Sequence, residues 1–395
     1  MEKFTFAHMS DVHLGVWHAH PELRSLALRA FEQVIGTIIN QRCSFAIISG
    51  DFFDTSMPGI DIVKFAIEQL LKLQDAGIPV YAIAGSHDYS PTGKTTLSVL
   101  ESARLLTNVH NRLVDDSRTG AQIFGVEGLR GGLDKHFFES LVVEATAKTG
   151  FKIFMLHAAI REFAIPQMRE TSVPIENLPK DFDYYASGHI HERRVEFYEK
   201  SPLVFPGPVF PCDFTELENL GHGSFSIVTV KDSKPSVHSV HINLAETEIV
   251  EISADGKRPE QVEQEFGKAL DKNDLKGKIL LLKSKGVLVS GKGSDINWKG
   301  IGDLAVSRGA LAVKSSLHIT AREMEGAPVQ TGATIPEIER AIVESHSGRG
   351  TMKKDVEAGI VEKLMHSLSI DRGEENRTAF ENKIKSEAKK ILDIA

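Results

Sequence analysis

The chain is poor in cysteine. Among its 395 residues only Cys43 and Cys212 are cysteines, and they stand far apart and outside any Cys-x-x-Cys spacing. Neither a disulfide framework nor a metal site built from thiolates is therefore expected. A reducing cytoplasm is the simplest location for a chain with so few cysteines.

Long hydrophobic runs and an excess of positive charge are also missing. No apolar stretch reaches the ~20 residues that a membrane span requires, and the N-terminal run KFTFAHMSD is typical of a strand rather than a signal peptide. We therefore expect no membrane partner. The formal net charge of −8 argues against a protein that coats nucleic acid through its overall charge, although a local basic face would be hidden in that sum.

What the chain does contain is enough apolar material for two or three domains, with 41% hydrophobic residues. In the first half, short β-branched and aromatic runs alternate with longer stretches whose apolar residues recur at helical spacing. This βαβα pattern predicts an α/β layer fold. The expected strands are Phe4 to Met9, Phe45 to Ser49, Val80 to Ala84, Gln122 to Val126 and Lys152 to Leu156, and the expected helices are Pro21 to Gln41, Ile60 to Ala76 and Thr95 to Leu106.

Beyond Tyr184 the pattern changes to strands without helices, joined by turns rich in glycine and proline, which predicts a second, antiparallel sheet. From Leu244 a strand–helix–strand–helix–strand pattern indicates a small α/β domain, and from Ile335 only helical periodicity remains. We therefore expect domains at residues 1–243 and 244–318 and a helical segment at residues 335–395.

Side chains that bind metal ions follow several of the expected strands. Asp11 with His13, and His189 with His191, are spaced i and i+2, so each pair shares one face if the backbone stays extended. Open α/β sheets place their ligands at the carboxyl ends of strands. The complete series is Asp11, His13, Asp51, His157, His189 and His191, with Ser86 and His87 in the turn after the third strand.

These residue types suit two adjacent divalent cations. Carboxylates mixed with imidazoles bind Mn²⁺, Fe²⁺ or Zn²⁺, and Mn²⁺ is the ion we favour. Asp51 is the candidate bridge, because a carboxylate between cations ~3.5–4 Å apart neutralises part of their repulsion while a shared water loses its proton near neutral pH. Such ion pairs cleave phosphate esters.

Single motifs also have simpler interpretations. A lone histidine is usually packed or capped, and we prefer that interpretation for His8, His18, His20, His110, His136 and His222. The segment SPTGKTT resembles a phosphate-binding loop, but the Walker pattern needs glycine five residues before Gly93, where this chain has Asp88. We reject that loop. The ordered ligand series is different, since several independent strand ends would have to coincide by chance.

Six motifs carry a resemblance to a known family: FAHMSDVHLG, ISGDFFD, AGSHD, LHAAIRE, SGHIHERR and VFPGPV. From about Phe4 to Pro208 they resemble the calcineurin-like metallophosphoesterases and, more narrowly, the SbcD and meiotic-recombination-eleven DNA repair nucleases. The resemblance implies a two-layer β-sandwich flanked by helices, a small α/β capping domain that contacts DNA, and a C-terminal helical segment. It also implies a nuclease that acts on DNA ends in double-strand-break repair with an SbcC-like coiled-coil ATPase.

The resemblance further implies roles for individual residues. One metal would be held by Asp11, His13, Asp51 and His191, and the other by Asp51, His157 and His189. His87 would stabilise or protonate the departing oxygen, and Asp88 would orient His87. Helices near Thr95 to Leu106 would pair two protomers into a homodimer.

One position departs from the family pattern. The family has asparagine where this chain has Ser86, and the asparagine oxygen ordinarily binds the second metal. A serine hydroxyl is shorter and binds cations more weakly, so it reaches the ion only through a water unless the loop moves inward. We expect weaker binding of the second metal and slower hydrolysis, with direct ligation by a shifted loop as the alternative.

Contacts with DNA and with a partner protein are less sharply indicated. Candidate phosphate contacts near the metal-bearing loops are Arg130, Lys135, Arg161, Arg193 and Arg194, although exposed basic residues are often only solvated. The stretches Lys353 to Leu368 and Phe380 to Ile391 each carry apolar residues along one helical side. These helices could dock on the ATPase or cover the protein's own surface.

Three functions fit these observations. We favour a two-metal phosphodiesterase that acts on DNA ends as an exonuclease and single-strand endonuclease. A small-molecule or cyclic-nucleotide phosphodiesterase would use the same ligands but would hardly need the second domain and the helical tail. A weakly catalytic scaffold that binds DNA ends is the alternative from another class, and Ser86 motivates it.

Overall fold

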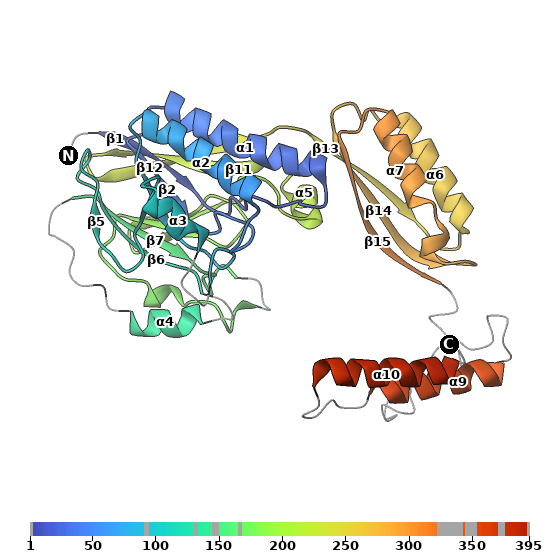
Figure 1. The fold of residues 1–395 in the computed structure, drawn as a ribbon. Helices are drawn as coiled ribbons and strands as arrows, with labels where there is room; N and C mark the ends of the chain where they lie inside the picture. The colour runs from blue at the N-terminus through green and yellow to red at the C-terminus, as the bar shows by residue number, and fades with distance from the viewer. Residues whose placement is uncertain are drawn as a thin grey trace. The chain divides into compact units, whose positions relative to one another are not determined.

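In the computed structural model, two six-stranded sheets pack face to face, and helices cover their outer faces (Figure 1). The structure describes residues 3–90, 95–129, 133–141, 143, 150–164, 168–321, 343, 354–369 and 376–392. This architecture confirms the two-layer β-sandwich flanked by helices that the sequence motifs imply.

The two sheets draw on strands that are far apart in the sequence. The first sheet has the order β12 (Lys234–Ile242), β11 (Gly223–Lys231), β1 (Phe4–Met9), β2 (Phe45–Ser49), β3 (Val80–Ile83) and β4 (Thr107–Asn108). The second has the order β5 (Val114–Asp115), β6 (Gln122–Val126), β7 (Lys152–His157), β8 (Tyr184–Gly188), β10 (Ser201–Phe205) and β9 (Arg194–Tyr198). Strands β1 to β4 run parallel, as do β6, β7, β8 and β10, so their carboxyl ends meet along one edge of the sandwich.

Alternation along β1 divides its side chains between two cores. Phe6 points between the sheets, where its ring stacks on Phe45 at 5.0 Å and meets Tyr184 edge-on at 5.3 Å. Ala7 and Met9 point to the opposite face, in the core that the helices cover. Both faces of the strand are therefore buried, which explains its continuous apolar run.

Helices α1 (Pro21–Asn40) and α2 (Ile60–Asp75) cover the outer face of the first sheet, and α4 (Asp134–Ser140) covers the second (Figure 1). Helix α1 begins with proline, which suits the first helical position because its missing N–H has no partner there. The buried side of α1 includes Phe31, Val34 and Ile38, in the helical spacing that the sequence displays.

Several details differ from the sequence-based expectation. The strands after Tyr184 form no separate antiparallel sheet, because β11 and β12 extend the first sheet while β10 pairs in parallel with β8. A short helix, α5 (Phe214–Asn219), interrupts a region expected to lack helices. Helix α3 (Thr96–Ser102) is shorter than the Thr95 to Leu106 segment, and Leu97 and Leu100 are buried in the core. The proposed homodimer contact there stays a prediction.

A third sheet has the order β13 (Thr247–Ser253), β14 (Ile279–Leu288) and β15 (Ala312–Ala321), with helices α6 (Pro259–Lys272) and α7 (Trp298–Ser307) in the same stretch of sequence. The chain divides into two compact units: residues 1–251, 266–283 and 298–316 form one, and residues 252–265, 284–297 and 317–395 the other. The domain boundaries expected from the sequence stay a prediction.

Two C-terminal helices, α9 (Lys354–Leu368) and α10 (Arg377–Leu392), contact each other and agree with the expected helical periodicity. Residues 335–342 and 344–353 of the expected helical segment, and residues 91–94 of the rejected phosphate-loop motif, lie outside the described residues. Among the described residues, no helix is both long and apolar enough to cross a bilayer.

His8 joins the two sheets. Its Nδ1 lies 2.8 Å from the Tyr184 hydroxyl and its Nε2 lies 3.0 Å from the Ser49 hydroxyl, so both ring nitrogens have partners inside the sandwich. The packed-histidine interpretation is confirmed for His8. Burial lowers its pKa from 6.5 to about 3.

This pKa shift predicts a pH-dependent stability. The folded protein keeps His8 neutral, whereas the unfolded chain binds a proton at this residue below pH 6.5. The folded state is therefore not penalised at His8 above pH 6.5, and it loses stability as the pH falls from 6.5 toward 3. We predict that His8→Gln flattens the free energy of unfolding against pH by up to ~1.4 kcal/mol per pH unit in this window. Chemical denaturation at several pH values measures the slope. The exposed His136→Gln is the control, and an unchanged slope for His8→Gln would contradict the prediction.

Candidate metal centre

The loops that follow the parallel strands bring the predicted metal ligands together. Asp11, His13, Asp51 and His189 have φ values of 50°, 46°, 48° and 78°, in the left-handed region that residues other than glycine rarely adopt. The expectation that Asp11 and His13, or His189 and His191, converge through extended backbone is therefore wrong. They converge because the chain turns sharply at each ligand.

Two glycines allow this close approach. A Cβ on Gly85 would lie 2.2 Å from the backbone nitrogen of Asp51, and one on Gly50 would lie 2.2 Å from Nδ1 of His157. Gly50 also has a φ of 89°. Any larger side chain at either position would push ligand-bearing loops apart.

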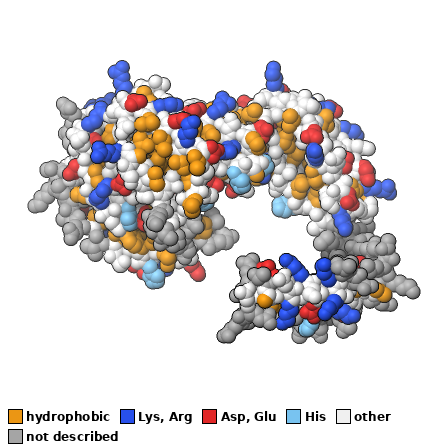
Figure 2. All heavy atoms as spheres, in the orientation of Figure 1, with side chains coloured by type: hydrophobic (Ala, Val, Ile, Leu, Met, Phe, Trp, Pro, Cys, Tyr) orange, Lys and Arg blue, Asp and Glu red, His pale blue; other side chains and the backbone are white. Residues whose placement is uncertain are grey.

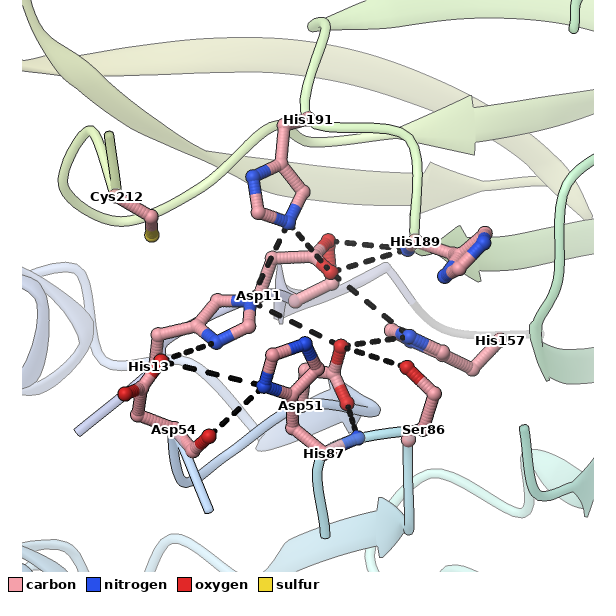
Figure 3. A network of polar contacts seen from close by, with 12 residues as sticks. Asp11, His13, Asp51, Asp54, Ser86, His87, His157, His189, His191 and Cys212 are labelled. Carbon is pink, nitrogen blue, oxygen red and sulfur yellow. Dashed lines mark hydrogen bonds and ion pairs between the residues drawn. The ribbon is translucent and has the colours of Figure 1, made fainter. Parts of the chain in front are cut away.

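The first group of candidate ligands consists of Asp11, His13, Asp51 and His191 (Figure 3). The Nε2 atom of His191 lies 3.4 Å from Oδ1 of Asp11 and 3.3 Å from Nε2 of His13. The His13 Nε2 atom in turn lies 3.8 Å from Oδ2 of Asp51. These atoms face one another from loops after three different strands, so the resemblance-based ligand set for one metal is brought together.

The second group consists of Asp51, His157 and His189, whose ligand atoms lie within 4.8 Å of one another. The Nε2 atom of His157 is 3.0 Å from Oδ2 of Asp51. Ser86 is close by, with Oγ 3.4 Å from the same Asp51 oxygen. Asp51 thus belongs to both groups, which is the geometry expected of a bridging carboxylate.

The orientation of His157 fits a cation. Its Nδ1 lies 2.8 Å from the backbone oxygen of Ser49, an acceptor that fixes the proton on Nδ1. The Nε2 atom is buried and lies 3.0 Å from Oδ2 of Asp51. A positive charge is favoured between this nitrogen and the carboxylate, and either a proton or a metal ion can supply it, so the residues present fit a divalent ion.

Charges within the cluster hold one another in place. Burial opposes ionisation of Asp11 and Asp51, yet the neighbouring imidazoles hold the pKa of both carboxyls well below the usual range. Burial likewise opposes charge on His191 and His157, but the carboxylates raise their pKa to about 11 and about 9. A metal ion must displace these protons, so binding in the cluster strengthens as the pH rises.

His189 behaves differently from the other two histidines. Burial and the neighbouring His157 lower its pKa to about 4. A neutral imidazole is the form that binds a metal, so His189 needs no deprotonation to act as a ligand at neutral pH.

His87 lies at the exposed side of the cluster. Its Nδ1 atom is 2.8 Å from the backbone oxygen of Asp54, and its ring meets His13 edge-on at 4.7 Å. The side chain of His87 is 47% exposed, in contrast to the buried ligands, so it is accessible to a substrate at the ion pair. The Asp54 carboxylate also lies 3.3 Å from Nδ1 of His13. Asp54 was not among the residues predicted from the sequence.

Asp88 occupies a different place from the one expected. Its buried carboxylate accepts bonds from the backbone N–H groups of Phe52, Phe53 and Gly85 at 2.9 to 3.0 Å. Burial and the Asp51 charge raise its pKa to about 6. Asp88 therefore joins the two ligand-bearing loops. The expectation that Asp88 orients His87 is wrong, because the residue that contacts the His87 ring is Asp54.

Two further residues of the site come from the loop and short helix α5 that sequence patterns did not reveal. Glu216 accepts a bond from Nδ1 of His191 at 2.6 Å. Cys212 places its sulfur within 4.8 Å of ligand nitrogens of His13 and His191, a position that the spacing of the cysteines did not indicate. Burial, together with the carboxylates of Glu216 and Asp11, raises the pKa of this thiol well above 9.0.

The predicted DNA contacts are more dispersed. Arg193 is exposed and Arg161 half-buried, while Arg194 pairs with Glu192 at 2.9 Å and lies over the Phe163 ring. Lys135 donates to the backbone oxygen of Glu170 at 3.4 Å, and Arg130 lies outside the described residues. On the face drawn in Figure 2, basic and acidic side chains are interspersed. DNA contact by these residues stays a prediction.

The fold and the paired ligand groups agree with a match to a known family. Residues 4–193 match the family model of the calcineurin-like phosphoesterases, so this part of the chain is similar to that family. Its ligands Asp11, His13, Asp51, His157, His189 and His191 all lie within that match.

Among curated proteins, the chain is similar to DNA double-strand break repair proteins named Mre11. It is 26% identical over 282 residues to that of Sulfolobus acidocaldarius, covering 68% of this chain and 72% of the relative. It is 24% identical over 306 residues to that of Archaeoglobus fulgidus, covering 71% and 68%. It is 31% identical over 210 residues to that of Methanococcus maripaludis, covering 51% and 55%.

The contact between Glu216 and His191 predicts an effect on metal affinity. Removing the carboxylate frees the ring of His191, so Glu216→Ala should weaken metal binding by about 10- to 100-fold. Calorimetric titration with Mn²⁺ measures this change. Glu218→Ala, on the same helix, is the matched control, and equal affinity of the two variants would refute the proposed role of Glu216.

Proposed function

We propose that this chain is a metal-dependent nuclease that hydrolyses phosphodiester bonds at DNA ends in double-strand-break repair, with exonuclease and single-strand endonuclease activity. The observation that carries the proposal is that one buried carboxylate, Asp51, belongs to both ligand groups. Similarity to the Mre11 repair proteins supports DNA as the substrate. The exposed His87 beside the ligands supports chemistry at an accessible phosphate.

Two divalent cations are the cofactors we propose, with Mn²⁺ favoured and Zn²⁺ or Fe²⁺ as alternatives. When bound, such a pair lowers the pKa of water and withdraws charge from a phosphoryl oxygen. Asp11, His13, Asp51 and His191 would hold one cation. Asp51, His157, His189 and the Ser86 hydroxyl would hold the other.

The chain's own residues supply positioning and proton transfer. If Nδ1 of His87 donates to the Asp54 oxygen 2.8 Å away, the ring is fixed and Nε2 is left to face the substrate. From there it can stabilise or protonate the departing oxygen. Asp88 ties the loop that carries His87 to the loop that carries Asp51, so the two side chains keep a fixed separation.

The proposed partners follow from the same relatives. DNA ends would approach the exposed side of the cluster, with Arg161, Arg193 and Arg194 near it and a small α/β domain at residues 244–318 as a second contact. Helices α9 and α10 expose apolar side chains, including Val356 and Leu368, which suits docking on an SbcC-like coiled-coil ATPase. A homodimer in a reducing cytoplasm completes the proposal.

The proposal is tested with a Mn²⁺-dependent digestion of a 3′-labelled duplex. His87→Ala should lower kcat by ~100-fold or more while DNA binding persists, because a general acid typically contributes this much. His136→Ala, an exposed histidine on α4, is the control and should cut normally. A wild-type protein that binds DNA without cutting it would overturn the nuclease assignment.

Ser86 gives a second candidate function specific support. A hydroxyl 3.4 Å from Asp51 is a weaker ligand than a carboxamide oxygen, and a weakly filled second position would leave a scaffold that binds DNA ends and cuts slowly. We predict that Ser86→Asn tightens binding of the second Mn²⁺ and raises the cleavage rate at low Mn²⁺. Calorimetry that finds two equally tight sites in the wild-type protein would remove the basis for this expectation.

Cleavage of cyclic nucleotides but not of DNA would favour the small-molecule enzyme.

A further inference from the structure

Cys212 lies beside the first ligand group. Its sulfur and one ring nitrogen each of His13 and His191 lie within 4.8 Å of one another. Figure 3 shows Cys212 on the loop that borders these two histidines. Two imidazoles and a thiol at this separation are able to share one metal ion.

The backbone around Cys212 is held firmly in this position. The indole Nε1 of Trp17 donates to the backbone oxygen of Pro211 at 2.8 Å, and the backbone N–H of Cys212 donates to Oε2 of Glu216 at 2.7 Å. The other oxygen of Glu216 accepts from Nδ1 of His191 at 2.6 Å. The carboxylate of Glu216 thus holds both the backbone of Cys212 and the ring of His191, so it fixes where the sulfur of Cys212 lies relative to that ring.

The orientation of the His13 ring is a second observation at the same place. Its buried Nδ1 lies 3.3 Å from the Asp54 carboxylate, and this contact leaves Nε2 to face Nε2 of His191 at 3.3 Å and Oδ2 of Asp51 at 3.8 Å. A carboxylate on one nitrogen of an imidazole typically fixes the ring so that the other nitrogen can bind a metal. The thiol of Cys212 donates to the backbone oxygen of Phe210 at 3.2 Å, a bond that a thiolate would give up on binding the ion.

We propose that Cys212 is a thiolate ligand of the cation in the first group, and that the thiolate raises the affinity of this position for thiophilic ions such as Zn²⁺, Fe²⁺ or Co²⁺ relative to Mn²⁺. The inference rests on the proposed two-metal site and assigns its ion preference. Soft thiolate ligands favour these ions, whereas oxygen ligands suit Mn²⁺. The second group contains no sulfur, so the two positions of the pair differ in preference.

Binding replaces one bond with another. The S–H bond of Cys212 ionises, its proton passes to solvent, and the sulfur lone pair forms the bond to the cation. No electron is transferred, and no further reactant is needed. One proton is released for the thiol in addition to any released by the imidazoles.

The test uses Co²⁺ titration of the full chain under reducing conditions, followed by ultraviolet absorption. A cobalt–thiolate bond gives a charge-transfer band that oxygen and nitrogen ligands do not give. We expect the band in the wild-type protein and in Cys43→Ala, and its loss in Cys212→Ser. Cys43 is the matched control because it is the other cysteine and is buried in the helix-covered core.

A competition experiment provides a second readout. The ratio of Zn²⁺ to Mn²⁺ affinity should fall at least about tenfold in Cys212→Ser. A band that persists in Cys212→Ser, or a wild-type protein that binds Co²⁺ without the band, would overturn the inference. Circular dichroism that matches the wild type confirms that the variant is folded.

Failure of this inference is distinct from failure of the nuclease proposal. Wild-type protein that cuts DNA and lacks the band retains the proposed function and loses only the cysteine ligand. Protein that shows the band and does not cut DNA keeps the cysteine ligand and loses the nuclease assignment.

Discussion

The buried carboxylate of Asp51 is the group on which the rest of the site depends. It lies 3.0 Å from His157 and 3.8 Å from His13, on two sides of the cluster, and the backbone N–H of His87 donates to its other oxygen at 2.7 Å. A buried negative charge without a cation is expensive, so the surrounding imidazoles and amides are held where they compensate it. The same compensation leaves room for ions, since a metal ion can take the place of the proton on His157 and on His191.

Strain in the backbone is the means by which the ligands reach this charge. Each residue held in the left-handed region costs of order 1–3 kcal/mol, and Asp11, His13, Asp51 and His189 all occupy it. Such strain persists only where contacts with the surrounding structure hold the loop in that conformation. Here the bonds from Asp11 N to Gly50 O at 3.1 Å and from His13 N to Asp51 O at 3.0 Å fasten one loop to the next. The rigid sandwich beneath these loops therefore sustains a geometry that the loops could not hold alone.

The sequence predicted the strands and ligands well because both depend on local signals. The apolar runs predicted the bounds of β1, β2 and β3 to within one residue, and the six ligands that the motifs indicated lie together in the structure. It could not predict contacts that depend on distant backbone. Asp88 bonds to amides 35 and 36 residues away, and Glu216 reaches His191 across 25 residues from a helix of only 6 residues, too short for periodicity to reveal. Cys212 was set aside for lack of a cysteine partner, although the fold places its sulfur within 4.8 Å of nitrogens of His13 and His191.

The position of β1 has a consequence for how the chain reaches its native state. This strand lies between β2 and β11, and Thr5 pairs with Thr229, a partner more than half the chain away. Contacts of such long sequence separation form slowly, because the chain loses the entropy of closing a large loop before the strand pairing contributes any stabilising free energy. During synthesis the edge of β1 that faces β11 stays unpaired until residues 223–231 leave the ribosome, and an unpaired apolar edge is prone to associate with other chains. The nascent chain is thus expected to depend on chaperones until β11 pairs with β1.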